Sequence, residues 1–271
     1  MAGECILLGP NRDPMRTLIR KLRYIISKSH ESPAVAEEEI AVSDSLFDSY
    51  SSVIGSLIPY YNELPADAKR HFVKRAHHFR SIKKFHFVGM EQNEETAILI
   101  SASAVQVTFG LKNYLLSHFE NIHVLADAYQ MENDKEIYVG HVAPEGIYLS
   151  WKHFLLGYSS NNDHYNVGLH EMAHALEYVN FLGFFGSDEF EEKFMMYKRQ
   201  AELTFPNDQN ESVNLFSEQG RANYHEAWAE GVEAFFENPE DLNQYYPNLY
   251  RLIKQLLNQD PLNKVKIVRP Q

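Results

Sequence analysis

Two histidines four positions apart, with a glutamate directly after the first, are the residues here whose spacing points most clearly to chemistry. They read HEMAH at 170–174, within the stretch NVGLHEMAHALEYVNF. On an α-helix, residues four apart lie one turn apart on the same face, so His170 and His174 can offer two imidazole nitrogens to one metal ion. Glu171 is rotated by about 100° from His170, so its carboxylate can lean over the metal and accept a proton from water.

The same pattern can arise by chance, because the chain holds 13 histidines and 37 acidic residues. The neighbours of the motif argue against chance. Leu169, Met172, Ala173 and Leu176 give the helix an apolar side, which places the histidines at the edge of a core. The pattern therefore favours a metal site over a structural helix with coincidental histidines.

A catalytic zinc site needs a third protein ligand and an open position. No H-x-x-G-x-x-H follows the motif, so we expect an acid from elsewhere, and the best segment is YHEAWAEGVEAFFENP at 224–239. Its acids Glu226, Glu230 and Glu233 follow helical spacing on one face. Such a stripe is often a solvated surface, but the other faces are apolar, and buried carboxylates need a cation or hydrogen-bond donors. Periodicity alone does not select the ligand.

Three motifs, in this order, resemble the Mlc titration factor A family of zinc metallopeptidases, whose catalytic helices are similar to those of anthrax lethal factor. They are NVGLHEMAHALE at 166–177, GRANYHEAWAEGVEAFFENP at 220–239 and YYPNLYRLIKQLLNQDP at 245–261. The resemblance covers roughly residues 57–263. It implies a mostly helical α+β fold, a gluzincin-like zincin, with a small β-sheet beside the active-site helix.

The resemblance also implies roles for individual residues. His170, His174 and Glu226 would bind one zinc ion per chain, with Glu171 as the catalytic base. Glu230 lies one turn beyond Glu226, where a carboxylate can hold the other N–H of a ligand histidine.

The sequence departs from the family pattern at two places. The family has a tyrosine seven residues before the third ligand, suited to donating a hydrogen bond to the oxyanion, and here that position is Gln219. Tyr224, two residues before Glu226, is the other candidate donor. Glu177 replaces the family's aspartate.

From these residues we expect a zinc-dependent peptidase that acts on short peptides in an aminopeptidase-like manner. The resemblance also implies a regulatory role in sugar uptake through a transcriptional repressor. The alternative is a zinc-containing binding protein that sequesters such a repressor with little or no turnover. Gln219 and the basic segment KRHFVKRAHHFRSIKK at 69–84 favour this alternative.

The rest of the chain must position these residues. Strands are expected at 121–126, 136–142 and 146–151, with turns at Asn133-Asp134 and Pro144–Gly146, and one exposed strand edge would hold an extended peptide. The segment 97–107 fits a buried strand or a helix equally well. Helices are expected from Asn166 onward, and Pro65 is expected at the first position of another helix.

The basic segment 69–84 has Phe72, Ala76 and Phe79 at helical spacing, so we expect an amphipathic helix with a solvated basic face or a partner-binding surface. Residues 1–45 are expected to form an N-terminal arm, with a helix candidate at 15–28. Residues 46–271 would form a single metallopeptidase domain.

Composition narrows the function further. The formal net charge of −12 disfavours direct binding of nucleic acid. One cysteine, Cys5, excludes an internal disulfide and a zinc site built from thiolates. No apolar run is long enough for a membrane span, and the N-terminus lacks the features of a signal peptide. We therefore expect a cytoplasmic protein.

Overall fold

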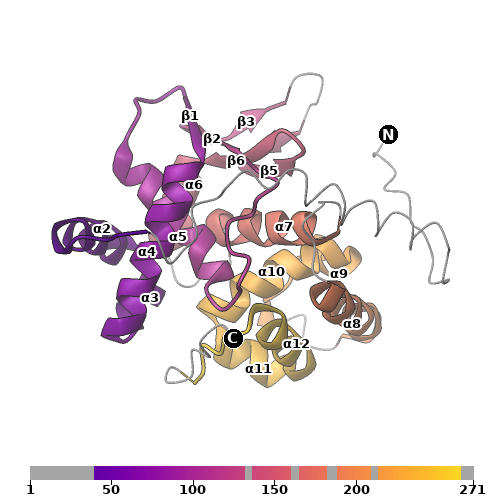
Figure 1. The fold of residues 1–271 in the computed structure, drawn as a ribbon. Helices are drawn as coiled ribbons and strands as arrows, with labels where there is room; N and C mark the ends of the chain where they lie inside the picture. The colour runs from indigo at the N-terminus through magenta and orange to yellow at the C-terminus, as the bar shows by residue number, and fades with distance from the viewer. Residues whose placement is uncertain (1–39, 132–135, 160–164, 182–187, 209–212, 264–271) are drawn as a thin grey trace. The chain divides into compact units, whose positions relative to one another are not determined.

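A four-stranded mixed sheet lies beside the helix that carries the HEMAH motif (Figure 1). The computed structural model describes residues 40–131, 136–159, 165–181, 188–208 and 213–263. Most of these residues are helical, which confirms the expected α+β class. The helix candidate at 15–28 and the Asn133-Asp134 turn lie outside the described residues. Within the described ranges, none of the helices has the length and apolar character of a membrane span.

The sheet has the strand order β1-β2-β6-β5. Strands β1 (Lys84–Val88), β2 (Asn121–Leu125) and β6 (Gly146–Ser150) run parallel, and β5 (Gly140–Ala143) pairs antiparallel with β6. The strands expected at 121–126 and 146–151 are confirmed, and the one expected at 136–142 is divided into two short strands at 137–138 and 140–143. Strand β1 was missed because its residues continue the basic segment. The short strands β3 (Tyr129–Gln130) and β4 (Ile137–Tyr138) form a separate pair.

The two faces of the sheet differ in composition. One face points into the core with fully buried side chains: Ile122, Val124, Ile147 and Leu149. The other face carries a row of stacked rings that crosses the strands in sheet order: His86, His123, Tyr148 and His141. Among the described strands β5 is the last of the sheet, so its outer side is an edge, and it lies beside the helix that carries HEMAH.

The segment 97–107 is a helix and not a strand. It belongs to α5 (Glu94–Thr108), which begins where the Asn93 side chain accepts hydrogen bonds from the backbone N–H groups of Glu95 and Thr96. Residues on every side of this helix are buried, because α2 (Asp44–Leu57), α4 (Ala66–Ile82) and α7 (Val167–Phe181) all pack against it. A helix buried on all sides has no polar face, so its sequence shows no period.

The basic segment forms most of α4, as expected, and Phe72, Ala76 and Phe79 are buried. The expected solvated basic face is only partly right. Arg75 is 2% exposed and donates to the carbonyl oxygens of Phe109 and Leu111. Pro65 precedes the first helical residue and is not part of the helix, because its backbone is extended, with ψ of 159°.

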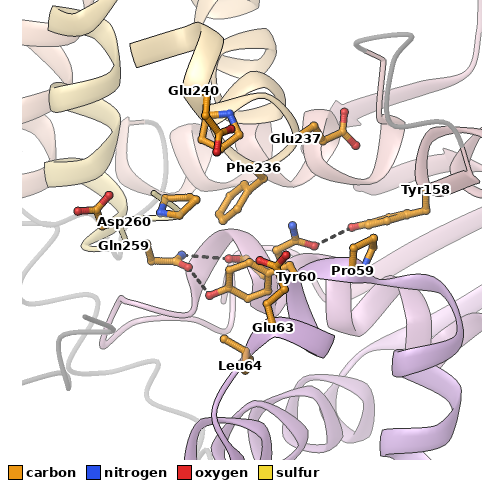
Figure 2. A pocket seen from close by; sticks show the side chains of 13 residues that line it. Pro59, Tyr60, Glu63, Leu64, Tyr158, Phe236, Glu237, Glu240, Gln259 and Asp260 are labelled. Carbon is orange, nitrogen blue, oxygen red and sulfur yellow. Dashed lines mark hydrogen bonds between the residues drawn. The ribbon is translucent and has the colours of Figure 1, made fainter. Parts of the chain in front are cut away.

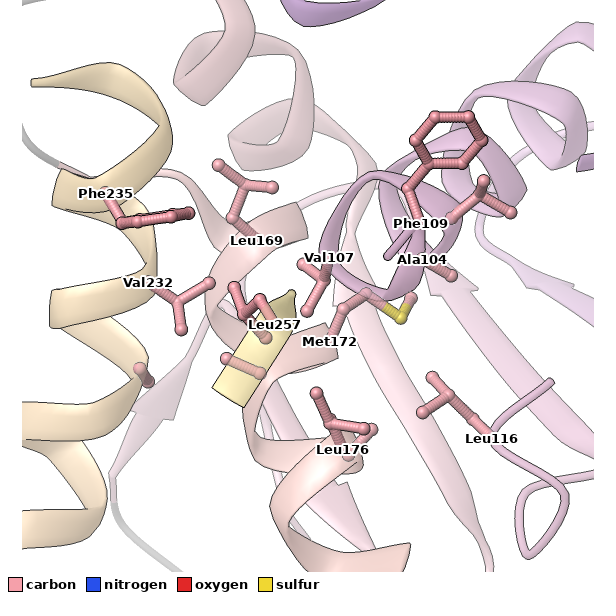
Figure 3. Packing of buried hydrophobic residues seen from close by; sticks show 14 of the residues in the cluster. Ala104, Val107, Phe109, Leu116, Leu169, Met172, Leu176, Val232, Phe235 and Leu257 are labelled. Carbon is pink, nitrogen blue, oxygen red and sulfur yellow. The ribbon is translucent and has the colours of Figure 1, made fainter. Parts of the chain in front are cut away.

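The C-terminal half of the described chain is helical. Here α7 lies against α10 (Tyr224–Glu237), and the Trp228 indole N–H of α10 donates to the Ala173 carbonyl of α7 at 2.9 Å. Figure 3 shows the apolar side of α7, with Leu169, Met172 and Leu176, meeting side chains of α5 and α10. The remaining elements are α3 (Pro59–Glu63), α6 (Trp151–Ser159), α8 (Asp188–Thr204), η2 (Phe205–Asn207), α9 (Glu218–Ala222), α11 (Pro239–Tyr245) and α12 (Pro247–Leu257).

Candidate metal centre

Asn166 fixes the start of α7, one turn before the first histidine. Its side-chain oxygen accepts from the Leu169 N–H at 3.1 Å, and its carbonyl accepts from the His170 N–H at 2.9 Å. This is the geometry of a helix N-cap. From this start, His170 and His174 project from successive turns of α7 toward α10.

Helix α10 brings Glu226 to the two histidines. The helix begins at Asn223, whose side chain accepts from the His225 N–H, so Glu226 lies in the first turn. Its two carboxylate oxygens lie 3.4 Å from the Nε2 atoms of His170 and His174, which are themselves 3.1 Å apart. The three side chains thus form a group whose ligand atoms all lie within 4.8 Å of one another.

A second glutamate of α10 sets the orientation of His170. The Nδ1 atom of His170 lies 2.6 Å from the Oε1 atom of Glu233, and Glu233 is 1% exposed. A carboxylate only accepts hydrogen bonds at neutral pH, so Nδ1 donates and the lone pair of the neutral ring lies on Nε2. This nitrogen is the one that faces Glu226 and His174.

Glu177 has the corresponding place for His174. Its Oε2 atom lies 3.9 Å from His174 Nδ1, and its Oε1 atom bonds the Nδ1 of His225. Both histidines therefore turn Nδ1 toward a buried glutamate and Nε2 toward Glu226. Carboxylates commonly hold metal-binding histidines in this way.

The charges at this group call for a cation. Burial alone would lower the pKa of His174, but the carboxylates of Glu177 and Glu226 raise that pKa to about 9. The two histidines in turn hold the pKa of Glu226 far below its ordinary value. Two imidazole nitrogens and a carboxylate, backed by two further carboxylates, match the His₂Glu donor set of catalytic zinc, which leaves a fourth position open. The residues present therefore fit a divalent metal ion.

Glu171 lies within this group without belonging to the three converging ligands. It is 4% exposed, and burial raises the pKa of its carboxyl group. Among the described residues, its buried Oε2 atom has no hydrogen-bond partner. Strand β5 passes directly over the carboxylate: a methyl group at Gly140 would lie 2.4 Å from Glu171 Oε1. Only a residue without a side chain leaves this room.

Three other residues that the sequence analysis proposed for the site do not contact His170, His174 or Glu226 in the way expected. The expectation for Glu230 is wrong: its carboxylate accepts from the backbone N–H and the hydroxyl of Ser217, and Glu233 takes the place beside His170. The Tyr224 ring packs under Lys198 Nζ of α8 at 3.9 Å, about 200° around α10 from Glu226. Gln219 is exposed on α9.

A cavity lies at the other end of α10, apart from the candidate metal ligands His170, His174 and Glu226 (Figure 2). Its wall includes Tyr60, Tyr158, Phe236 and Glu237. Glu237 accepts from the Asn166 side chain at 2.8 Å, and the Asn166 backbone N–H donates to Glu233. Asn166 therefore joins the cavity wall to the carboxylate that orients His170.

The position of Glu233 leads to a prediction about metal affinity. Glu233→Gln should weaken zinc binding by roughly 10–100-fold, because the loss of a carboxylate behind a ligand histidine commonly has this effect. Zinc titration against a competing chelator measures the change. Glu230→Gln, the same substitution one turn earlier, is the matched control and should keep the affinity of the unmodified protein. An effect of Glu230→Gln equal to that of Glu233→Gln would contradict this assignment.

The sequence held a signal for Glu233 that spacing alone did not use. Glu233 stands between Val232 and Ala234 and is followed by two phenylalanines, so it lies in the most apolar part of its helix. A glutamate in such a run needs a buried partner. The close approach of Gly140 to Glu171 had no local signal, because the two residues belong to different elements.

The comparisons with known proteins agree with this geometry. The family model described as glucose-regulated metallo-peptidase M90 matches residues 34–257. The match starts within the segment 1–45 that the sequence motifs had left outside the resemblance. A search of curated proteins returns no match. Because the family model covers most of the sequence, the chain belongs to the glucose-regulated metallo-peptidase M90 family.

Proposed function

We propose that this chain is a zinc-dependent peptidase that cleaves short peptides in an aminopeptidase-like manner. The observation that carries the proposal is the convergence of His170, His174 and Glu226 on one point. Beside them lies Glu171, whose Oε2 atom has no hydrogen-bond partner in the part of the chain that the structure describes. Membership in a metallo-peptidase family supports the reaction type. Zinc is the proposed metal, since imidazole and carboxylate donors in this number are typical of catalytic zinc.

Zinc bound at this site would polarise the peptide carbonyl and lower the pKa of a water molecule to about 7. The chain's own residues have two further tasks. The Glu233 carboxylate accepts from Nδ1 of His170 and leaves its Nε2 atom for the ion, and Glu177 lies 3.9 Å from Nδ1 of His174. Glu171 accepts the proton of the attacking water and passes it to the leaving amine.

We propose that the substrate binds along the edge strand β5. A peptide can add to an exposed sheet edge through backbone hydrogen bonds, and this mode of binding tolerates many different side chains. The strand passes over Glu171 at Gly140, so a peptide along its outer edge would bring a carbonyl group close to the base. Recognition through the backbone fits a peptidase that acts on short peptides.

Gly140→Ala tests this arrangement. The added methyl group would meet the Glu171 carboxylate at 2.4 Å, so the base must move away from its position. A displaced group near the reaction centre commonly costs about 100-fold in rate. We expect kcat to fall by about this factor while zinc content stays unchanged. Ala143→Ser, on the same strand, is the matched control. Full activity in Gly140→Ala would show that Glu171 does not act from this position.

The experiment that tests the proposed function is the hydrolysis of short peptides by the purified protein. We expect turnover of amino-acid anilides or tripeptides, loss of turnover with a chelator, and recovery on addition of zinc. Turnover that a chelator does not affect would contradict a metal-dependent reaction. Zinc binding without turnover on a broad peptide library would favour the zinc-containing binding protein instead.

The family description also names regulation by glucose. We propose, as a more distant step, that the activity serves the regulation of sugar uptake and that a transcriptional repressor is a partner. Co-purification of the protein with such a repressor, with and without glucose in the culture, would test this. A protein that purifies without the repressor under both conditions would contradict it.

A further inference from the structure

Tyr165 lies beside the candidate metal ligands His170, His174 and Glu226. Its ring centroid is 6.1 Å from that of His170, with the planes at 49°, and the residue is 42% exposed. It directly precedes Asn166, the fully buried N-cap of α7, whose backbone N–H donates to Glu233. Asn166 and His170 are thus both held by the start of α7 and by Glu233. Because Tyr165 is the neighbour of Asn166, its backbone has a fixed position relative to His170.

The phenol of Tyr165 is a hydrogen-bond donor near neutral pH. A tyrosine hydroxyl has an ordinary pKa of about 10, so it keeps its proton at this pH. The ring lies beside that of His170, so the phenol is close to the candidate metal ligands. A protonated phenol with one side open to solvent is available to a ligand that enters the site.

The donors expected from the sequence are less well placed. The Tyr224 ring packs against Phe194 and Lys198 of α8, and Gln219 is exposed on α9. During peptide hydrolysis, negative charge develops on the carbonyl oxygen, and a positioned hydrogen-bond donor stabilises that charge. A peptidase site that is built around carboxylates needs such a donor in addition to the metal.

We propose that Tyr165 donates a hydrogen bond to the carbonyl oxygen of the bound peptide. This hydrogen bond becomes stronger as the oxygen gains negative charge. The inference rests on the proposed function and names a residue of the same site. The phenol keeps its proton throughout, so no bond at Tyr165 forms or breaks. Its contribution belongs to the transition state, because the charge is largest there.

Tyr165→Phe removes the hydroxyl group and keeps the ring against His170. We expect kcat to fall by about 10²–10³, the usual loss of one oxyanion donor, with KM changed by less than about threefold. Zinc content should remain that of the unmodified protein. The affinity for a phosphinic peptide, which mimics the tetrahedral transition state, should fall in parallel, as isothermal titration calorimetry can measure.

Tyr178→Phe is the matched control. Tyr178 also lies at α7, but its ring packs against His118 and Phe119. This variant should keep kcat, KM and inhibitor affinity. Unchanged kcat and inhibitor affinity in Tyr165→Phe, while Glu171→Gln is inactive, would overturn the role of Tyr165 and leave the proposed function standing. Absence of turnover in the unmodified protein would overturn the proposed function and the role of Tyr165 with it.

Discussion

Glu171→Gln should keep its metal ion and lose peptide hydrolysis by about 10²–10⁴ in kcat, the range that a positioned general base commonly contributes. The amide has nearly the shape of the carboxylate but cannot accept the proton of water. The structure gives a reason to expect a loss of kcat at the upper end of this range. Glu171 is buried, its Oε2 atom has no partner among the described residues, and it is not one of the three converging ligands.

The matched control for this variant is Glu192→Gln. Glu192 is an exposed glutamate of α8, so the same change in charge and shape should leave turnover unaffected. Zinc content and turnover should be measured on the same samples, so that loss of metal is not mistaken for loss of the base. Substantial hydrolysis by Glu171→Gln with its zinc in place would assign the base to another group.

Glu226→Ala should abolish tight zinc binding and, with it, all activity. The substitution leaves two imidazoles, one ligand fewer than catalytic zinc sites use. The loss should therefore exceed the roughly 10–100-fold expected for Glu233→Gln, where all three ligands remain. The difference follows from the structure, in which Glu226 lies 3.4 Å from both Nε2 atoms, whereas Glu233 meets His170 at Nδ1, on the other side of the ring.

Glu226→His offers a rescue experiment for the same position. Three histidines also form a zinc site, so this variant should regain part of the zinc affinity that Glu226→Ala loses. Competition titrations with a chromophoric chelator would rank the two variants against the unmodified protein. Tight zinc binding that survives Glu226→Ala would show that the third ligand is another residue.

The spacing of residues predicted the two site helices well. HEMAH and the three acids of 224–239 both follow helical periods, and α7 and α10 have the expected positions and apolar sides. Helical periodicity could not predict which of the three acids is the metal ligand and which lies behind His170. Glu226, Glu230 and Glu233 project from similar faces, and the turn that meets His170 Nδ1 depends on how α7 crosses α10. Contacts such as that of Trp228 with Ala173 decide this crossing.

Contacts between distant segments were also beyond prediction. Tyr165 and Gly140 reach the site through the start of α7 and the edge of the sheet, and neither carries a local pattern. Helix α5 gave an ambiguous signal because its environment is apolar all around. In these cases the role of a residue depends on its tertiary contacts, and local sequence patterns do not predict those contacts.

The alternative of a binding protein gains little from the basic segment. Arg75 is buried, and Lys83 donates its ammonium hydrogens to the carbonyl oxygens of Leu116 and Phe119 at 3.1 and 2.6 Å. Two of the positive charges that suggested a partner surface therefore stabilise the fold. Gln219, in place of the family's tyrosine, remains the better argument for low turnover, and the Tyr165 variant addresses it directly.

The most direct test of the metal centre is elemental analysis of the protein purified without chelator. The geometry of His170, His174 and Glu226 predicts about one zinc ion per chain. Glu226→Ala, prepared in parallel, should contain much less. Protein that carries no metal and takes none up from a zinc solution would contradict the metal centre and the peptidase activity built on it.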